Sequence, residues 1–501
     1  MTLRCLFVDF NAYFASVEQY DCMPLRGRPI GVVPVMAATT CCIAASYEAK
    51  AFGVKTGTGA REAQLLCPDI LLVEARPARY IALHHELMAA IGDCIPHAEP
   101  LSIDEVPCWL IGRERERGNA EAIAQSIKQA LIDRGFSPAI CCSIGIAPNK
   151  FLAKTASDMQ KPDGLTVIEQ ADLPQALHGL ELRDLCGIGA SMEHRLRAAG
   201  IHTVEQLCAA PREYLRAAWG SIEGERYWLQ LRGYHVPDRT TRRGSIGHSH
   251  VLGPELRTFA GMRSVLFKLL AKAAMRLRRE RFFAGGLSIH IRFLGLEAGF
   301  SRDLTFAPLD DTPSLLRLLG DALVSLEGAI GQRRWQPKRN PPLSVAVTLG
   351  ALQPAGALTE TLLPITRRSQ GISAALDGIN RRYGNNAVYF GAMQAAITQD
   401  AAPMRIPFSK IPNIAFEEDV TTRNMAFGHE PLHEGGCDPA AGLMDQHMLR
   451  FKVLAEAHHR AVEPQRNPSG IETNRGGAGG RIPSSRHLKS NAPVASGDLL
   501  F

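Results

Sequence analysis

The sequence predicts an α+β protein of several domains. At 501 residues, the chain is long enough for more than two domains of ordinary size. Short apolar segments typical of strands, among them Leu6–Phe10 and Ala139–Ile146, alternate with segments whose apolar residues recur at helical spacing, such as Ala120–Arg134. Hydrophobic residues make up 46% of the chain and the formal net charge is +6, which is ordinary for a globular protein.

The sequence also argues against several other classes of protein. No apolar run reaches membrane-spanning length, and the opening Met1–Cys5 lacks the charged and apolar regions of a signal peptide, so we expect a cytoplasmic protein with no membrane partner. The 12 cysteines show no paired CxxC spacing. The sequence therefore indicates buried free thiols, with neither a zinc site nor a disulfide framework.

Two acidic motifs stand out. Leu6–Glu18 begins as an apolar strand that delivers Asp9 near its end and then passes into a helix. Leu101–Val106 places Asp104 and Glu105 side by side in a stretch apolar enough for a buried strand. Neither motif contains Lys or Arg, and a buried carboxylate must be paired, protonated or bound to metal.

Three such carboxylates offer the hard oxygen ligands that Mg²⁺ prefers, and two bound ions would make a phosphoryl-transfer site. The alternative is that Asp9 caps a strand end and that Asp104 and Glu105 lie in a solvated turn.

The letters around the acids point to a family. Residues 9–18, together with Ser102–Glu105, resemble the signature of the Y-family translesion DNA polymerases. The resemblance continues through Ser46–Lys55, Gly145–Lys154 and Lys161–Gly164 in family order, and reaches about Pro354.

The fold implied by this resemblance is a right-hand polymerase with a palm, small fingers, a helical helix-hairpin-helix thumb and an α+β little finger. The implied boundaries are 1–13 and 75–170 for the palm, 14–74 for the fingers, 171–238 for the thumb, and 239–355 for the linker and little finger. A C-terminal extension would follow at 356–411, and 412–501 is expected to be a disordered tail.

The resemblance also implies a catalytic centre. Asp9 and Asp104 would bridge two Mg²⁺ ions, Glu105 would complete the catalytic ion, and the backbone carbonyl of Phe10 would be a further ligand, with Mn²⁺ able to substitute. Primer-template DNA and dNTP would be the substrates, and the enzyme would act as a monomer with low fidelity.

Nucleotide contacts are implied by the same motifs. Tyr13, Tyr47, Lys50 and Lys161 would bind the triphosphate, while Phe14 would be the steric gate against a ribose hydroxyl. Family members usually carry Arg where this chain has Lys50, which gives up a bidentate contact to phosphate. The alternatives are that Tyr47 and Lys50 are surface helix residues and that Phe14 is a core residue.

DNA contacts are expected later in the chain. Gly187 and Gly189 lie in a segment that resembles a helix-hairpin-helix, where backbone amides approach a phosphate; a glycine-capped helical turn is the alternative. Arg242 and Arg243 follow in a basic connector.

A helix is then predicted with one apolar face, from Met262 to Leu277, and with charges expected in solvent at positions that include Lys268, Lys272 and Arg276. Half-buried strands at Leu287–Phe293 and Leu343–Leu349 would complete a domain whose DNA binding is strongly salt-dependent and insensitive to sequence.

The C-terminal part is less patterned. Ile372–Gly391 has helical spacing, although Ala387–Phe390 within it is strand-like. The last four residues resemble the end of bacterial peptides that bind the sliding clamp, but the Gln that usually opens such peptides is absent. These residues are Asp498, Leu499, Leu500 and Phe501, and an accidental match is the alternative.

The function predicted is therefore translesion synthesis by a DNA-directed DNA polymerase during damage tolerance and DNA repair. The alternative is a non-catalytic polymerase-fold scaffold that binds DNA and clamp and recruits other mutasome factors. Retention of all three acids favours the enzyme. A helix-hairpin-helix repair nuclease would leave the motif at Ser46–Lys55 unexplained.

Overall fold

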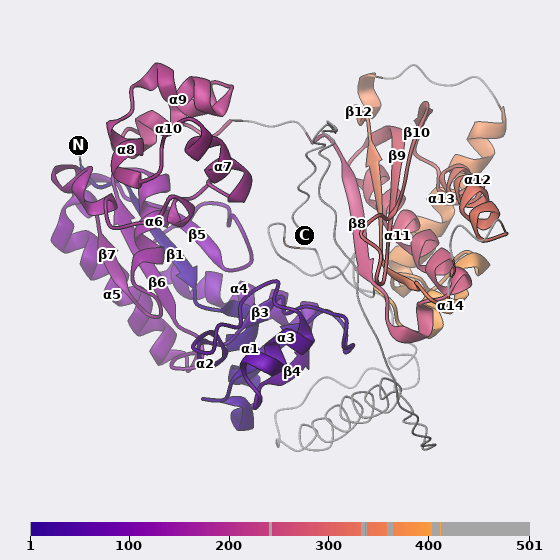
Figure 1. The fold of residues 1–501 in the computed structure, drawn as a ribbon, viewed down its shortest axis with the longest axis horizontal. Helices are drawn as coiled ribbons and strands as arrows, with labels where there is room; N and C mark the ends of the chain where they lie inside the picture. The colour runs from indigo at the N-terminus through magenta and orange to yellow at the C-terminus, as the bar shows by residue number, and fades with distance from the viewer. Residues whose placement is uncertain are drawn as a thin grey trace, which may run out of the picture. The chain divides into compact units, whose positions relative to one another are not determined.

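The structure, a computed structural model, describes residues 2–239, 243–331, 336, 338–357, 364–402 and 411, with the backbone alone at 329–331 and 364–367. These residues form three sheets with their helices, in the mixed α and β architecture that the sequence predicts (Figure 1). No helix among them is both long enough and apolar enough to cross a membrane.

A four-stranded sheet, which we call the central sheet, has the order β5-β1-β6-β7. Its strands are β1 (Cys5–Phe10), β5 (Glu105–Trp109), β6 (Cys142–Ala147) and β7 (Leu165–Val167). β1 pairs antiparallel with both β5 and β6, and every residue of β1 and β6 is buried. β5 is an edge strand, which accommodates Pro107 because a proline has no backbone N–H to donate.

Side-chain alternation divides this sheet into two faces. On β1, Leu6, Val8 and Phe10 join the core beneath α4 (Pro77–Cys94) and α5 (Arg117–Asp133). Cys5 and Phe7 point to the opposite face, where α6 (Lys150–Met159) packs; we call this the α6 face. Asp9 follows Cys5 and Phe7 in the alternation and so belongs to the α6 face.

The close packing of α6 depends on Gly145 of β6. A Cβ atom at this position would lie 2.0 Å from the backbone oxygen of Ala153 in α6. No side chain fits there, so the glycine allows the helix to lie directly against the sheet.

A small three-stranded sheet has the order β3-β2-β4. Its elements are β2 (Ile30–Val33), β3 (Ala44–Ala45), β4 (Leu71–Glu74), α1 (Tyr13–Asp21), η1 (Met23–Leu25), α2 (Tyr47–Lys50) and α3 (Ala60–Leu66). α1 is tied to the start of α4 because Glu18 and Asp21 form ion pairs with Arg76, and Asp21 also pairs with Arg79.

A helical unit follows the central sheet. It comprises the short helices η3 (Gln170–Asp172), η4 (Gln175–Leu177) and η5 (Leu182–Asp184), then α7 (Ala190–Ala198), α8 (Val204–Ala209), α9 (Arg212–Trp219) and α10 (Glu223–Leu231). Leu196 and Leu207 share a buried cluster with Phe7 of β1, so this unit packs on the α6 face. Around Gly187, where a helical hairpin is predicted, the structure has the three-residue helix η5, followed by α7 and α8.

The C-terminal sheet has five strands in the order β10-β9-β11-β8, with β12 paired to β9. Its elements are β8 (Ile246–Val251), β9 (Phe282–Phe293), β10 (Phe300–Leu309), β11 (Pro342–Gly350), β12 (Gln353–Pro354), η6 (Pro254–Leu256), α11 (Phe259–Arg279) and α12 (Thr312–Gly331). The two predicted strands are confirmed, and α11 covers the sheet with its predicted apolar side.

The prediction that the charges of α11 lie in solvent is wrong for three of them. Lys268, Lys272 and Arg276 are buried, and Lys268 is only 1% exposed. The ammonium of Lys268 donates to the backbone oxygen of Ala401 at 2.6 Å, and that of Lys272 donates to Ala402 at 2.8 Å. The chain returns to cover this side of α11, and its carbonyl groups compensate for the lost water.

The covering segment comprises η7 (Ala355–Ala357), α13 (Pro364–Tyr383), η8 (Gly391–Met393) and α14 (Gln394–Thr398). Arg278 of α11 forms a bidentate ion pair with Asp377 of α13, at 2.7 and 2.8 Å. The predicted strand at Ala387–Phe390 is wrong. The Asn380 side chain bonds both the N–H and the carbonyl of Val388 at 3.0 Å, and so takes the backbone groups that a neighbouring strand would need.

Candidate active site

The three acids lie at neighbouring strand ends of the central sheet. Asp9 of β1 and Glu105 of β5 are cross-strand partners. The strand predicted over Leu101–Val106 is wrong in its first half, because residues 101–104 form bends and β5 begins at Glu105. Asp104 is nevertheless held beside β1, since the backbone N–H of Phe10 donates to its carbonyl at 2.9 Å.

Two of the acids have cationic partners that the motifs do not contain. The Lys161 ammonium lies 2.7 Å from Asp9 Oδ1, and the Lys154 ammonium lies 2.7 and 2.8 Å from the Glu105 oxygens. Lys154 is on α6 and Lys161 is just beyond it, so both reach the acids from the α6 face. The motifs themselves contain neither lysine nor arginine, and the cationic partners come from 49 and 152 residues away in sequence.

The site remains short of positive charge despite these lysines. Burial raises the pKa of Asp9 to about 7, with Asp104 adding to the shift and Lys161 opposing it. The pKa of Asp104 is also raised, first by burial and then by Glu105, although the Ser102 hydroxyl donates to it at 2.6 Å. Both carboxyl groups therefore resist ionisation in the absence of a further cation.

Across the described ranges, no three His, Cys, Asp or Glu side chains are grouped closely enough to hold a metal ion. Asp9 and Glu105 are each engaged by a lysine in this arrangement. Their oxygens are nevertheless the donor type that a hard divalent cation takes, and cation binding would require the lysines to change partners.

Tyr47 and Lys50 lie one turn apart on α2, and the Lys50 ammonium is 4.3 Å from the centre of the Tyr47 ring. Burial raises the pKa of Tyr47 to about 12, and the charges of Lys161 and Asp9 also act on this hydroxyl. The pKa of Lys50 is lowered by burial and by the charge of Lys161. Three of the residues predicted to bind triphosphate thus converge near Asp9.

Phe14 and Tyr13 begin α1 and are both buried. The Phe14 ring stacks on Tyr80 of α4 with a centroid separation of 4.6 Å, and the Tyr13 hydroxyl donates to the Tyr80 carbonyl at 2.7 Å. The Tyr80 hydroxyl donates in turn to Glu18 at 2.7 Å. Sequence analysis missed Tyr80, whose only signal was its place on the apolar face of a helical segment.

Only some of the residues predicted to contact DNA lie within the described ranges. Gly187 has φ +88° in the turn before α7, and Gly189 immediately precedes that helix. Arg243 forms an ion pair with Glu280. Arg242 and the terminal peptide 498–501 lie outside the described residues.

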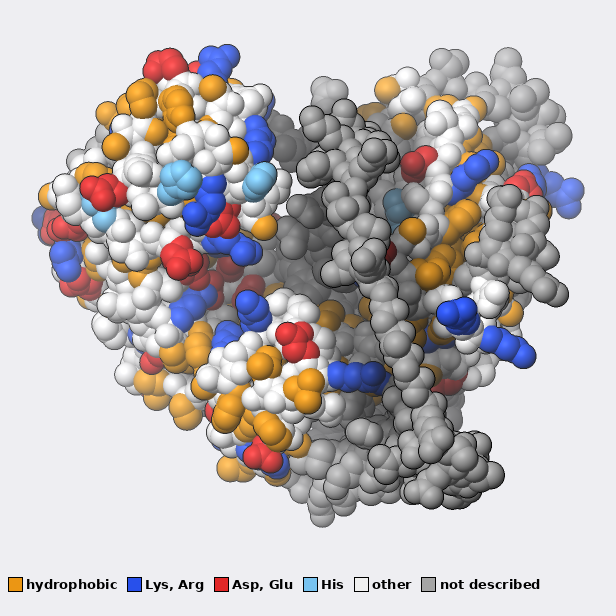
Figure 2. Space-filling model, viewed as in Figure 1, with side chains coloured by type: hydrophobic (Ala, Val, Ile, Leu, Met, Phe, Trp, Pro, Cys, Tyr) orange, Lys and Arg blue, Asp and Glu red, His pale blue; other side chains and the backbone are white. Residues whose placement is uncertain are grey.

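The visible surface of the helical unit is not uniformly basic. Figure 2 shows basic, acidic and histidine side chains next to one another there. Arg212 and Arg216 both pair with Glu225, and Arg197 pairs with Glu193, so these arginines do not form a patch of a single sign.

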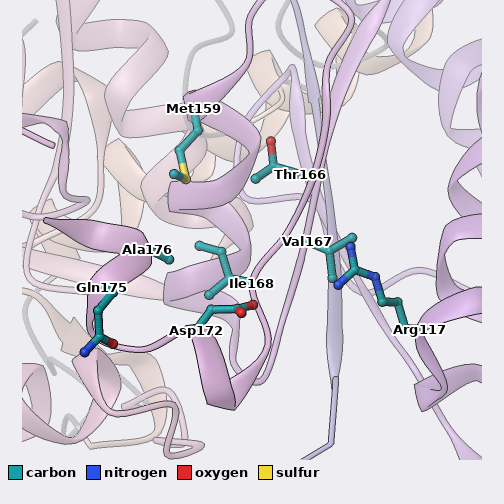
Figure 3. Close-up of a pocket in the computed structure, with 8 residues that line it drawn as sticks. All are labelled: Arg117, Met159, Thr166, Val167, Ile168, Asp172, Gln175 and Ala176. Carbon is teal, nitrogen blue, oxygen red and sulfur yellow. The ribbon is translucent and has the colours of Figure 1, made fainter. Parts of the chain in front are cut away.

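A solvent-open hollow of about 540 Å³ lies along β7, at the edge of the central sheet. Its lining comes from the end of α6, from β7 and from η3 and η4, with Arg117 of α5 (Figure 3). None of the predicted site residues lines it, so the geometry gives it no part in the acidic site.

Two family profiles match this chain. The profile of the impB/mucB/samB family matches residues 8–158, and that of the impB/mucB/samB family C-terminal domain matches residues 243–362. The N-terminal match contains all three acids.

Curated relatives share most of their length with this chain. A DNA polymerase IV of Moorella thermoacetica is 33% identical over 392 residues, which cover 77% of this chain and 94% of the relative. A DNA polymerase IV of Pelotomaculum thermopropionicum is 31% identical over 396 residues, with the same two coverages of 77% and 94%.

A solved Y-family DNA polymerase chimera has the same fold, with a TM-score of 0.57 and 24% identity over 70% of this chain and 99% of its own. The non-catalytic scaffold is not favoured, because the relatives are named polymerases. The chain therefore belongs to the impB/mucB/samB family, the Y-family translesion polymerases, and is a DNA-directed DNA polymerase of the translesion type.

Proposed function

We propose that Asp9, Asp104 and Glu105 hold two Mg²⁺ ions for nucleotidyl transfer from dNTP to a primer 3′-hydroxyl, with the Phe10 carbonyl as a further ligand and Mn²⁺ able to substitute. Y-family polymerases generally depend on divalent metal ions. The observation that carries the proposal is the cross-strand pairing of Asp9 with Glu105 beside Asp104.

The chemistry of the donor set fits this role. Burial raises the pKa of Asp9 and Asp104, and the nearby Lys161 does not fully offset these shifts, so a divalent cation would favour the ionised carboxylates. When bound, divalent ions lower the pKa of the primer hydroxyl and neutralise charge on the triphosphate.

The lysines would have a second task during catalysis. Lys161 lies between Asp9 and Asp158, at 2.7 and 2.8 Å. We infer that its ammonium exchanges a carboxylate partner for triphosphate oxygens when nucleotide enters. The Tyr47 hydroxyl would donate a hydrogen bond to the same phosphates. Lys50 would contribute a single ammonium without the bidentate geometry of an arginine.

Tyr13 and Phe14 would limit the space around the sugar. The Tyr13 hydroxyl is engaged by the Tyr80 carbonyl, so a triphosphate contact by Tyr13 would have to use its backbone or a changed side-chain position. The stacking of Phe14 on Tyr80 supports a steric gate, because a ring backed by a buried aromatic has no room to retreat from a 2′-hydroxyl.

Primer-template DNA would be held by the remaining units. Backbone amides at Gly187 and Gly189 would bind phosphate, and the C-terminal sheet would supply further backbone contacts as a little finger. Small residues on the side of that sheet away from α11, such as Ser288, Ala346 and Gly247, would allow a close approach. For the sliding clamp, the proposal rests on the sequence of residues 498–501 alone.

Primer extension tests the proposed site directly. We expect Asp104→Ala to reduce extension with Mg²⁺ by roughly a hundredfold or more, because a metal ligand is lost. Its affinity for primer-template should stay within about twofold of the unmodified protein, since the proposed DNA contacts lie elsewhere. Extension at the unmodified rate would refute the assignment of the acids.

A further inference from the structure

The loop that carries Lys161 is closed tightly between α6 and β7. It runs from Gln160 to Gly164. A Cβ atom on Gly164 would lie 1.9 Å from the Gln160 carbonyl oxygen, and Asp163 has φ +58°. Such a turn has little freedom of its own, so the direction of the Lys161 side chain depends on what holds the loop to the sheet.

Two buried side chains of the central sheet hold it. Asn11 and Ser143 are each 1% exposed, just after β1 and within β6. Asn11 Oδ1 accepts from the Asp163 N–H at 2.8 Å, and Asn11 Nδ2 donates to Ser143 Oγ at 3.1 Å. The Ser143 hydroxyl donates to the Gln160 carbonyl at 3.1 Å and accepts from the Gly164 N–H at 3.2 Å. These bonds reach three of the five loop residues.

We propose that Asn11 is a positioning residue that, through Ser143, fixes the Lys161 loop so that the lysine amine faces both Asp9 and the triphosphate. The inference rests on the proposed contact of Lys161 with nucleotide. Asn11 lies two residues after Asp9, so the strand that delivers the acid also sets the position of its cationic partner.

The contacts at position 11 use both ends of an amide. Its oxygen accepts from the Asp163 N–H, and its NH₂ group donates to the Ser143 hydroxyl, which also lies 3.2 Å from the amide oxygen. An aspartate would offer no donor and would add a negative charge beside Asp9. An alanine would leave the Asp163 N–H without this buried acceptor.

Lys128 also holds the Lys161 loop, so the loop does not depend on Asn11 alone for its fold. The Lys128 ammonium binds the Asp163 carbonyl at 2.7 Å and its carboxylate at 2.5 Å, as well as the Cys142 carbonyl at 2.9 Å. Because these bonds hold the same turn from α5, the loop should remain folded without Asn11 while Lys161 loses its fixed direction.

The test measures dNTP affinity without chemistry. Purified variants are bound to a dideoxy-terminated primer-template with Mg²⁺ and titrated with the correct dNTP by fluorescence. Asn11→Ala should weaken dNTP binding by roughly fivefold to tenfold, the equivalent of one or two buried hydrogen bonds. Combined with Lys161→Ala, it should add little, because both changes remove the same contact.

Ser143→Ala is the second variant and should match Asn11→Ala, which keeps the test open should Asn11→Ala fail to fold. Ser16→Ala is the matched control. The Ser16 hydroxyl is also buried and donates to Asn11, but to its backbone carbonyl at 2.7 Å and without contact to the loop. Ser16→Ala should lower the unfolding temperature about as much as Asn11→Ala does, but it should leave dNTP affinity unchanged.

The results would distinguish the positioning role of Asn11 from the nucleotide contact of Lys161. Multiplicative losses in the Asn11→Ala, Lys161→Ala double variant would overturn the positioning role while leaving the nucleotide contact of Lys161 intact. Weakened binding in Ser16→Ala equal to that in Asn11→Ala would assign the effect to general packing and overturn it too. An unchanged affinity in Lys161→Ala alone would refute the nucleotide contact itself, and the inference would fall with it.

Discussion

At the residue scale, the alternation of side chains along β1 decides the chemistry of Asp9. The odd-numbered residues of this strand point to the α6 face, where Lys154 and Lys161 are within reach of Glu105 and Asp9. The acids can therefore fold as partly neutralised pairs, which reduces the cost of burying them before a metal ion binds.

The steric role of Phe14 gives a residue-scale prediction. Phe14→Ala should raise the ratio of ribonucleotide to deoxyribonucleotide incorporation by roughly tenfold or more, because the 2′-hydroxyl gains space next to the Tyr80 ring. The measurement is the kcat/KM ratio for a matched pair of nucleotides.

Phe136→Ala is the control for loss of a buried ring. Phe136 is also 5% exposed and belongs to the same buried cluster as Phe14, but its ring lies 5.8 Å from that of Tyr20, near the opposite end of α1 from Phe14. It should destabilise the protein by about 3 kcal/mol without changing the sugar ratio. If Phe14→Ala gave the same pattern, Phe14 would be a core residue, and Tyr13 would become the next candidate for the gate.

The acids were predictable from sequence, but their partners were not. Asp9, Asp104 and Glu105 stand in short motifs whose apolar neighbours reveal a buried strand. Lys161 was predicted to bind the triphosphate and Lys154 ends one of the family motifs, yet their pairing with the acids depends on how closely α6 packs against the sheet. Tyr80, Asn11 and Ser143 make their contacts to residues that are tens of positions away in sequence, and local periodicity does not predict such pairs.

At the element scale, the contact between α6 and β6 sets the position of Lys154. Gly145→Ala would put a Cβ atom 2.0 Å from the Ala153 carbonyl, so α6 must move away from the sheet. We expect a loss of about 1–3 kcal/mol in stability and a clear loss of polymerase activity, since Lys154 would no longer reach Glu105.

Gly118→Ala in α5 is the matched control. A Cβ atom there meets nothing within 4 Å, and alanine favours a helix, so stability should be unchanged or rise by up to about 1 kcal/mol. Thermal unfolding and primer extension on both variants check the prediction. Equal behaviour of the two would mean that α6 tolerates displacement.

A buried histidine predicts the pH dependence of stability. His84 of α4 bonds the Ile103 carbonyl through Nδ1 at 2.7 Å, and burial lowers its pKa to about 4 from 6.5. Because the unfolded chain binds the proton more readily, this contribution is complete above pH 6.5 and is lost as the pH falls towards 4.

The expected loss at pH 5 is on the order of 2 kcal/mol from His84. His84→Gln, which retains a donor but does not titrate, should flatten the decline of the unfolding temperature between pH 6.5 and 5. An unchanged decline would assign the acid sensitivity to other groups, such as His250, whose pKa is also lowered to about 4 by burial and by the charges of Lys268 and Lys272.

Element boundaries show where sequence patterns stop being informative. The long amphipathic helix α11 was predicted from its apolar face, but the burial of Lys268 and Lys272 was not, because a later segment covers them. Ala387–Phe390 has the composition of a strand but finds no partner strand, since the Asn380 side chain takes the backbone groups of Val388.

At the scale of the whole molecule, the proposed activity combines the acidic site and the proposed DNA-binding surfaces in one chain. The family matches at 8–158 and 243–362 cover these two parts separately. The proposed domain boundaries follow from the resemblance of the sequence, whereas the packing of 364–402 against α11 and α12 depends on long-range contacts such as Arg278 with Asp377. Periodicity could not reveal these contacts.

The last prediction concerns Gly497–Phe501, which lies outside the described residues. If Leu499, Leu500 and Phe501 anchor the chain to a sliding clamp, they would raise the effective concentration of the polymerase at the primer end. Deletion of residues 497–501 should leave extension on short primers unchanged and abolish stimulation by the clamp on long templates. A chain that ends in the same five residues in scrambled order is the control for tail length and composition. Stimulation that survives the deletion would show that another surface of the chain binds the clamp.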